Sequence, residues 1–278
     1  MSMTTGNSTA ILSPADVDAL LVQPVLAESV AAQVAKVIST TGESLRLPVV
    51  TQDPQAAWVP EAAEIPISDQ GLDEVQVRYH ALKGLTVLSN ELLADSSPGA
   101  AQLVGEGLAR DIARKLDEAF FGATVANGPS GIAAASGVQA VEVDGAFSNL
   151  DPFHEAISKA ETVGAVTGAF VTTPAVALAL AKIKTGAGSN APLLGSDPTA
   201  PTSRTVAGVP LLVSPSVEAG AVWAIPAERT VIGMRQNVDV RSDSSAFFSS
   251  DRTAIRAVMR AGFGFPHTAA IVKITSQA

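Results

Sequence analysis

One long amphipathic segment in the middle of the chain limits the possible folds more than any other feature. Apolar side chains recur there at every fourth position, which predicts a helix with a continuous buried face. This stripe, the expected core of the helix, consists of Val104, Leu108, Ile112, Leu116 and Phe120. Ser97 and Pro98 suit a first helical turn and Gly122 suits a helix end. The sequence therefore predicts one helix over residues 98–121, roughly 36 Å long at about 1.5 Å per residue.

The opposite face of the same segment is charged. Three pairs of opposite sign have the i,i+4 spacing at which helical side chains meet, namely Glu106–Arg110, Asp111–Lys115 and Arg114–Glu118. An apolar stripe opposite a charged face is typical of a long surface helix. It also fits the longest helix of an ordinary domain, so this segment alone does not decide the fold.

The segments on either side of this helix limit the possible folds further. Residues 56–69 read AAWVPEAAEIPISD, residues 74–96 read EVQVRYHALKGLTVLSNELLADS, and residues 120–132 read FFGATVANGPSGI. In this order around a long helix, they resemble the major capsid proteins of tailed phages, the Hong Kong 97 phage-like family. Each motif is short, and their order and spacing carry the resemblance, which covers nearly the whole chain.

The resemblance implies an α+β fold, the Hong Kong 97 phage-like major capsid fold. An N-terminal arm would occupy residues 1–43, and an extended loop, a β-hairpin, would occupy residues 44–82. Residues 83–134 and 230–262 would form a peripheral domain around the long "spine" helix. Residues 135–229 and 263–278 would form an axial domain.

Local patterns predict the remaining elements. A weak helical pattern covers residues 14–39, and because Pro24 interrupts it we expect two short helical pieces or a partly extended arm. Further helices are predicted at residues 151–163 and 174–184. Strands are predicted at residues 45–50, 75–88, 138–143, 169–172, 209–213, 221–225, 230–232, 238–241, 252–263 and 267–275. A long Pro-rich connection separates the first two strands, and its length indicates a role outside its own domain.

Composition excludes several functional classes. The net charge is −9 and the N-terminal arm has no basic cluster, so we expect a container for DNA that does not bind it tightly. Cysteine is absent, which removes disulfides and thiolate metal sites. No apolar run approaches the roughly 18 residues that a membrane span needs, so no membrane partner is expected.

Residues suited to catalysis are few. The imidazoles are His80, His154 and His267, and their spacing fits no metal site. The glycine cluster at residues 128–131 is one residue short of a nucleophile elbow. We therefore expect no catalytic, cofactor or metal site. A soluble α/β enzyme that uses carboxylates is the least favoured alternative.

Candidate contact residues between subunits fall into two charged groups and one aromatic residue. The acidic group is in the extended loop, at Glu61, Glu64 and Asp69. The basic group is a stripe on one face of a predicted strand, at Arg252, Arg256 and Arg260. Alternatively, the arginines form an ion-pair network within one subunit, and the acidic loop is a solvated face. Trp58 either anchors a contact between chains or packs under its own loop.

The function implied by the resemblance is structural. Many copies would form hexamers and pentamers that close into an icosahedral phage head around double-stranded DNA, assembled in the cytoplasm of a bacterial host. The expected partners are other copies of the chain, a portal, a separate scaffold and decoration proteins, with packaged DNA held non-specifically. An encapsulin-type compartment, which has the same fold but encloses protein cargo, is the alternative.

Some members of this family join their subunits covalently, through an isopeptide bond from a lysine near the extended-loop tip to an asparagine of a neighbour. Residues 45–82 contain no lysine, and their cations are Arg46 and Arg78. Arginine stays protonated and cannot act as the nucleophile. The sequence therefore predicts a non-covalent shell.

Overall fold

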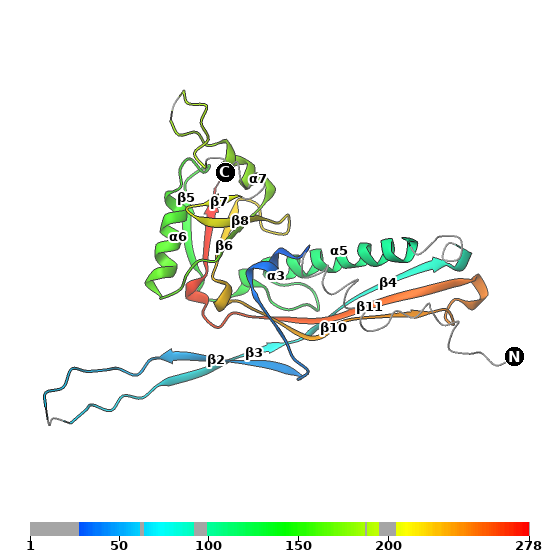
Figure 1. Ribbon diagram of the computed structural model, residues 1–278, viewed down its shortest axis with the longest axis horizontal. Coiled ribbons are helices and arrows are strands. Elements are labelled where there is room, and N and C mark those ends of the chain that lie inside the picture. Colours follow the sequence, from blue (N-terminus) through cyan, green and yellow to red (C-terminus); the bar gives the residue numbers. More distant parts are fainter. Residues whose placement is uncertain (1–27, 62–63, 92–98, 187, 195–203, 278) are drawn as a thin grey trace.

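The computed structural model describes residues 28–61, 64–91, 99–186, 188–194 and 204–277, and these form an α+β fold with three sheets (Figure 1). A four-stranded sheet runs along the long axis of the molecule, and a six-stranded sheet stands near one end of it (Figure 1). A two-stranded hairpin projects away from both (Figure 1). The predicted fold class is confirmed.

The predicted spine helix is present as α5 (Gly99–Phe121), which lies along one face of the four-stranded sheet (Figure 1). The strands of that sheet are, in spatial order, β1 (Lys36–Ser39), β10 (Val231–Asp243), β11 (Arg252–Gly264) and β4 (His80–Ser89). On the helix stripe, Ile112, Leu116 and Phe120 are at most 3% exposed. Val104 and Leu108 are half-buried. The four-residue period thus identifies the face that packs inward.

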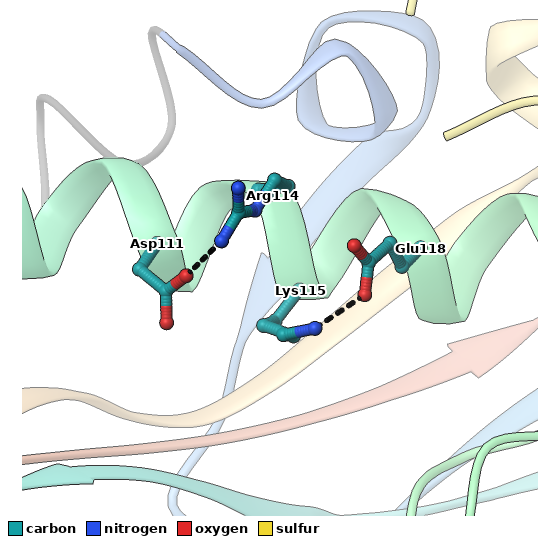
Figure 2. Close-up of polar contacts among 4 residues, drawn as sticks. All are labelled: Asp111, Arg114, Lys115 and Glu118. Carbon is teal, nitrogen blue, oxygen red and sulfur yellow. Dashed lines mark hydrogen bonds and ion pairs between the residues drawn. The ribbon is translucent and has the colours of Figure 1, made fainter. Parts of the chain in front are cut away.

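The described residues of the charged side of α5 form three ion pairs, and two of these pairs differ from the predicted ones. Arg114 pairs with Asp111 at 2.6 Å and Lys115 pairs with Glu118 at 2.7 Å, both with i,i+3 spacing (Figure 2). The i,i+4 pair of Arg110 with Glu106 is present at 4.0 Å. Side chains three and four positions apart are both neighbours on a helix. The spacing of the charges in the sequence therefore could not determine which of two nearby opposite charges each residue pairs with. Ser97 and Pro98 lie outside the described residues.

The segment at residues 14–39 is predicted to form two short helical pieces or a partly extended arm, and its described part is a short helix followed by an extended strand. Within the described residues it contains one short helix, α3 (Val30–Val34), which Ala35 ends in an extended conformation. The chain then forms β1, which pairs in parallel with β10. β-Branched residues favour strands, and Val37 and Ile38 are half-buried in β1. The available sheet edge therefore outweighs the helical spacing of the valines.

The two-stranded hairpin consists of β2 (Ser44–Gln52) and β3 (Gly71–Arg78), which are antiparallel. The single strand predicted over residues 75–88 is wrong, because the chain changes partner at Tyr79 and continues as β4 beside β11. At this crossing the carbonyl of Arg78 approaches Gly262 so closely that a Cβ there would collide with it. Glycine at that position allows the hairpin to leave the sheet.

The six-stranded sheet has the strand order β5 (Gln139–Val143), β12 (Val272–Ser276), β9 (Ala221–Ile225), β6 (Ala169–Thr172), β8 (Val209–Val213) and β7 (Thr205–Val206). Its helices are α6 (Asp151–Thr162) and α7 (Pro174–Lys182), and its core includes Phe153, Phe170 and Leu180. Short 3₁₀ turns lie at Ile132–Ala134, Ala227–Arg229, Phe248–Ser250 and Thr268–Ala270.

Three predicted boundaries in this half of the chain are wrong. The strands at 230–232 and 238–241 are one strand, β10, with register shifts between Met234 and Gln236 and between Gln236 and Asp239. The helix predicted to residue 184 ends at Lys182. The last strand begins only at Val272, after a 3₁₀ turn.

A buried carboxylate joins the arm, the spine helix and the six-stranded sheet. Asp117 of α5 is 5% exposed, and its Oδ1 accepts hydrogen bonds from Ser29 Oγ at 2.6 Å and from the Ala31 N–H at 3.0 Å. Its Oδ2 accepts from the Val30 N–H at 3.1 Å and from Ser214 Oγ at 3.5 Å. Asp117 therefore caps the first turn of α3 from a distant part of the chain.

Burial raises the pKa of the Asp117 carboxyl above its ordinary value, against the opposing effect of these hydrogen bonds. Because the folded pKa exceeds the unfolded one, the folded state binds more protons between the two values. The stability contributed by this group therefore falls as pH rises through the folded pKa. The ionised carboxylate is held in place by its four donors, although its desolvation is unfavourable.

Replacing Asp117 with alanine should lower the free energy of unfolding by about 2–3 kcal/mol, because it leaves buried donors of Ser29 and α3 unpaired. Asp111→Ala is the matched control on the same helix, since Asp111 makes an exposed ion pair that is worth at most about 1 kcal/mol. Urea unfolding of unassembled subunits measures both. Equal losses for the two variants would contradict this role of Asp117.

Candidate assembly surfaces

The described residues offer little for catalysis. They contain no group of three or more His, Asp or Glu side chains placed to hold a metal ion. The Nδ1 of His80 lies 3.2 Å from the Asn127 carbonyl oxygen, His154 is exposed on α6, and the Nδ1 of His267 is buried without a partner. No described helix has both the length and the apolar character required to span a membrane. The surfaces of the molecule therefore become the candidate sites.

The loop between β2 and β3 exposes both its charges and its apolar side chains. Trp58 is fully exposed, as is nearly all of Ile67, so neither packs under the loop in this chain. The acidic side chains Glu61, Glu64 and Asp69 are exposed as well. The two limbs of the loop are held together at Ser68, whose hydroxyl accepts from the Gln55 N–H at 2.9 Å. The described residues of the loop thus present an acidic and partly apolar surface to the outside.

The three arginines lie on the face of β11 that turns away from α5. Arg252, Arg256 and Arg260 are exposed, whereas the intervening residues Ala257 and Met259 are buried. Among the described residues, none of the three arginines has an acidic group within ion-pair distance. The intrachain ion-pair network is therefore not formed by the described part of the chain.

The surroundings of the arginines add to the positive charge of this face. In the neighbouring strand β4, Lys83, Leu85 and Val87 are exposed opposite Val258, Arg256 and Ala254 of β11. On the other side, Arg256 lies opposite Arg241 of β10. Like charges directly opposite in a sheet repel each other. The face of β11 around Arg252, Arg256 and Arg260 is therefore positively charged and can attract an acidic surface.

A pocket of about 200 Å³ opens between α5, the first residues of β4, β11 and the loop at residues 125–129. Leu116 and Ala119 contribute to it from α5, and Met259 and Ala261 contribute from β11. Lys115 and Glu118, which pair with each other, also line it. Sequence patterns did not indicate this pocket, because its walls come from four separate segments.

Asp117 was also missed from the sequence. One signal pointed to it: the residue lies four positions after Ala113, on the side of α5 that is otherwise apolar. A carboxylate at such a position must find buried donors. Which donors it finds cannot be read from the sequence, because Ser29 lies 88 residues away and Ser214 lies 97 residues away.

Solved capsid structures have the same architecture. A chain from Microbacterium phage Oxtober96 matches with a TM-score of 0.72 and 19% identity over 90% of this chain and 91% of that one. The capsid of an empty GTA particle, computed with C5 symmetry, matches with a TM-score of 0.74 and 19% identity over 100% and 95%. A Gordonia phage Cozz chain matches with a TM-score of 0.68 and 20% identity over 90% and 87%. The chain therefore shares the fold of these structures.

Family membership follows from the sequence as a whole. The profile of the phage capsid family matches residues 9–276, so the chain belongs to this family. It is a major capsid protein, a structural component of the virion that assembles into oligomeric shells, and it is not an enzyme. No curated protein sequence matches the chain. The family match supports a phage-type head over an encapsulin-type compartment.

Proposed function

We propose that the chain forms hexamers and pentamers that close into an icosahedral head around double-stranded DNA, and that the loop of each subunit lies across its neighbour. This proposal rests on two exposed surfaces of opposite charge that do not contact each other within the described part of one chain. The loop exposes Trp58 and acidic side chains, while the β11 stripe exposes arginines that have no acidic partner among the described residues. Two surfaces that complement each other but do not meet in one subunit can meet between subunits.

Such a contact is heterologous, because the loop of one copy meets a different surface on the next. A heterologous contact whose rotation closes produces a ring, and five- and six-membered rings are the units of an icosahedral shell. We assign the extended-loop role to β2, β3 and the residues between them. The four-stranded sheet with α5 is the proposed peripheral domain, and the six-stranded sheet is the proposed axial domain.

The proposed partners follow from this role. DNA is held mainly by enclosure, since a net charge of −9 disfavours tight phosphate binding. A portal for DNA entry, a separate scaffold and decoration proteins complete the proposed assembly. The shell is proposed to form in the cytoplasm of a bacterial host.

Replacing residues 54–70 with a short Gly-Ser turn tests the role of the loop. The strands β2 and β3 remain, so the subunit should fold with unchanged circular dichroism, but it should accumulate as monomers or single rings. Negative-stain images and a sizing column distinguish these from closed shells. Wild-type chains serve as the control and should give megadalton shells. Closed shells from the shortened variant would mean that the loop serves its own chain.

Charge reversal tests the pairing of the loop with the stripe. Changing Arg252, Arg256 and Arg260 to glutamate should raise the critical concentration for assembly about tenfold or more, because three exposed pairs at about 0.5 kcal/mol each amount to roughly 1.5 kcal/mol. The matched control changes the same arginines to lysine and should assemble normally. Adding Glu61→Arg, Glu64→Arg and Asp69→Arg to the glutamate variant should restore assembly. No rescue would refute the pairing.

The proposed shell is non-covalent. Residues 45–82 contain no lysine, and Lys83 lies on β4, at the opposite end of β3 from the loop. Purified particles boiled in SDS should therefore give one band at 28.2 kDa. A ladder of covalent multimers would show that another nucleophile joins the subunits.

A further inference from the structure

We propose that Trp58 of one subunit inserts into the pocket beside α5 of the neighbouring subunit and anchors the loop there. This inference rests on the proposed function, because it requires that the loop reaches a second copy. It adds a specific receptor site and a specific anchoring side chain. In the described part of the chain, Trp58 is exposed and the pocket is open.

The pocket has the size of one large side chain. Its volume of about 200 Å³ equals that of roughly six or seven water molecules at about 30 Å³ each. Its walls are mainly apolar, with Leu116 and Ala119 on one side and Met259 and Ala261 on the other. The methionine thioether interacts favourably with aromatic rings. An aromatic side chain therefore fits this pocket better than a charged one.

The rim of the pocket can satisfy the polar atom of an indole. The carboxylate of Glu118 and the carbonyl oxygen of Asn127 both accept hydrogen bonds, and the indole N–H is a donor only. The ammonium group of Lys115, 2.7 Å from Glu118, also lies at this rim and can interact with the face of the ring. Tryptophan fits both the walls and the rim.

Trp58 is the appropriate occupant. The chain has two tryptophans, and the other one, Trp223, is 1% exposed in the core. Trp58 is fully exposed at a position where the described part of its own chain provides no cover. A tryptophan side chain removes about 150–250 Å² from water when it is buried. Contact with a second copy of the chain would provide this gain.

The position of the pocket connects this contact with the charged one. β4 is an edge strand of the four-stranded sheet, and Ala81 in it both lines the pocket and lies opposite Arg260 of β11. Glu61 follows Trp58 by three residues, which span at most about 11 Å of extended chain. A loop anchored at the pocket by Trp58 can therefore bring Glu61 to Arg260 around the β4 edge. A single placement of the loop on the neighbouring subunit would therefore allow both the contact of Trp58 with the pocket and the contact of Glu61 with Arg260.

Acrylamide quenching of tryptophan fluorescence tests the proposal without any substitution. In dissociated subunits Trp58 should be quenched and Trp223 protected, so about half of the emission is accessible. In assembled shells the accessible fraction should fall close to zero, with a shift of the emission to shorter wavelength. Shells in which Trp58 stays as accessible as in free subunits would overturn the inference while leaving the proposed function intact. If no shells form at all, the proposed function itself fails.

Disulfide trapping tests whether the pocket is the site at which Trp58 is buried. The chain contains no cysteine, so in the variant with Trp58→Cys and Ala126→Cys only the introduced thiols can form disulfides. A disulfide between position 58 of one subunit and position 126 of the next links successive subunits, whereas a disulfide between identical positions gives only dimers. Ala126 is exposed and lines the pocket. Oxidised particles of this variant should give a ladder of linked subunits on a non-reducing gel, up to the size of a ring. Reduction should return it to one band.

The matched control combines Ala126→Cys with Phe248→Cys. Phe248 is the other strongly exposed aromatic residue of the described chain, in the turn between β10 and β11. This control should give no ladder. Equal ladders from the two pairs, or protection of Trp58 in shells with no ladder from its own pair, would mean that Trp58 is buried elsewhere or that the pocket holds another segment.

Discussion

The packing of α5 against both sheets is the constraint on which the rest of the structure depends. Phe120, at the end of the helix, is fully buried, and its ring centroid lies 5.0 Å from that of Phe121, 5.2 Å from Phe263 and 5.9 Å from Phe265. The first two contacts are edge-to-face, the geometry that aromatic quadrupoles favour. Strand β9 extends the same core. Its side chains alternate, so Trp223 joins the core of α5 and Val222 joins the core under α6 and α7. The two sheets therefore cannot separate without exposing a strand that is buried on both faces.

The packing of the hairpin differs between its base and its tip. Its base packs closely on the four-stranded sheet, where Gly264 leaves room for Val77 and Leu47, and a Cβ there would lie within 2.7 Å of both side chains. Its tip has no such support, and Trp58 and Ile67 extend into solvent. Large apolar side chains exposed together on an ordered segment indicate a binding surface. The base of the hairpin is thus part of the packed subunit, whereas the described residues near its tip expose apolar side chains to solvent.

The matching solved chains have low sequence identity to this chain, so the features that specify the fold must be ones that do not require identical side chains. At 19% identity, a TM-score of 0.72 means that few individual side chains are shared while the arrangement of elements is. Cores accept many combinations of apolar residues if volume and pattern are kept. The period of the α5 stripe, the alternation in β11 and the order of elements are features of this kind. The chemistry of the loop and of the α5 pocket belongs to this chain, because a surface contact depends on particular side chains.

The sequence by itself determined the elements whose signal is local. The four-residue period of α5 and the alternation of arginines with alanine and methionine in β11 each arise within one segment, so the face of every residue can be read without knowing its partner. Features that depend on contacts between residues far apart in the chain were determined only by the tertiary structure. The strand β1, the change of partner at Tyr79, the buried Asp117 with its donors on Ser29 and Ser214, and the four-walled pocket are all of this kind. A local sequence pattern indicates which side of a segment is apolar. The sheet edge, hydrogen-bond donor or cavity wall that this segment contacts comes from residues far away in the chain, so the local pattern does not reveal it.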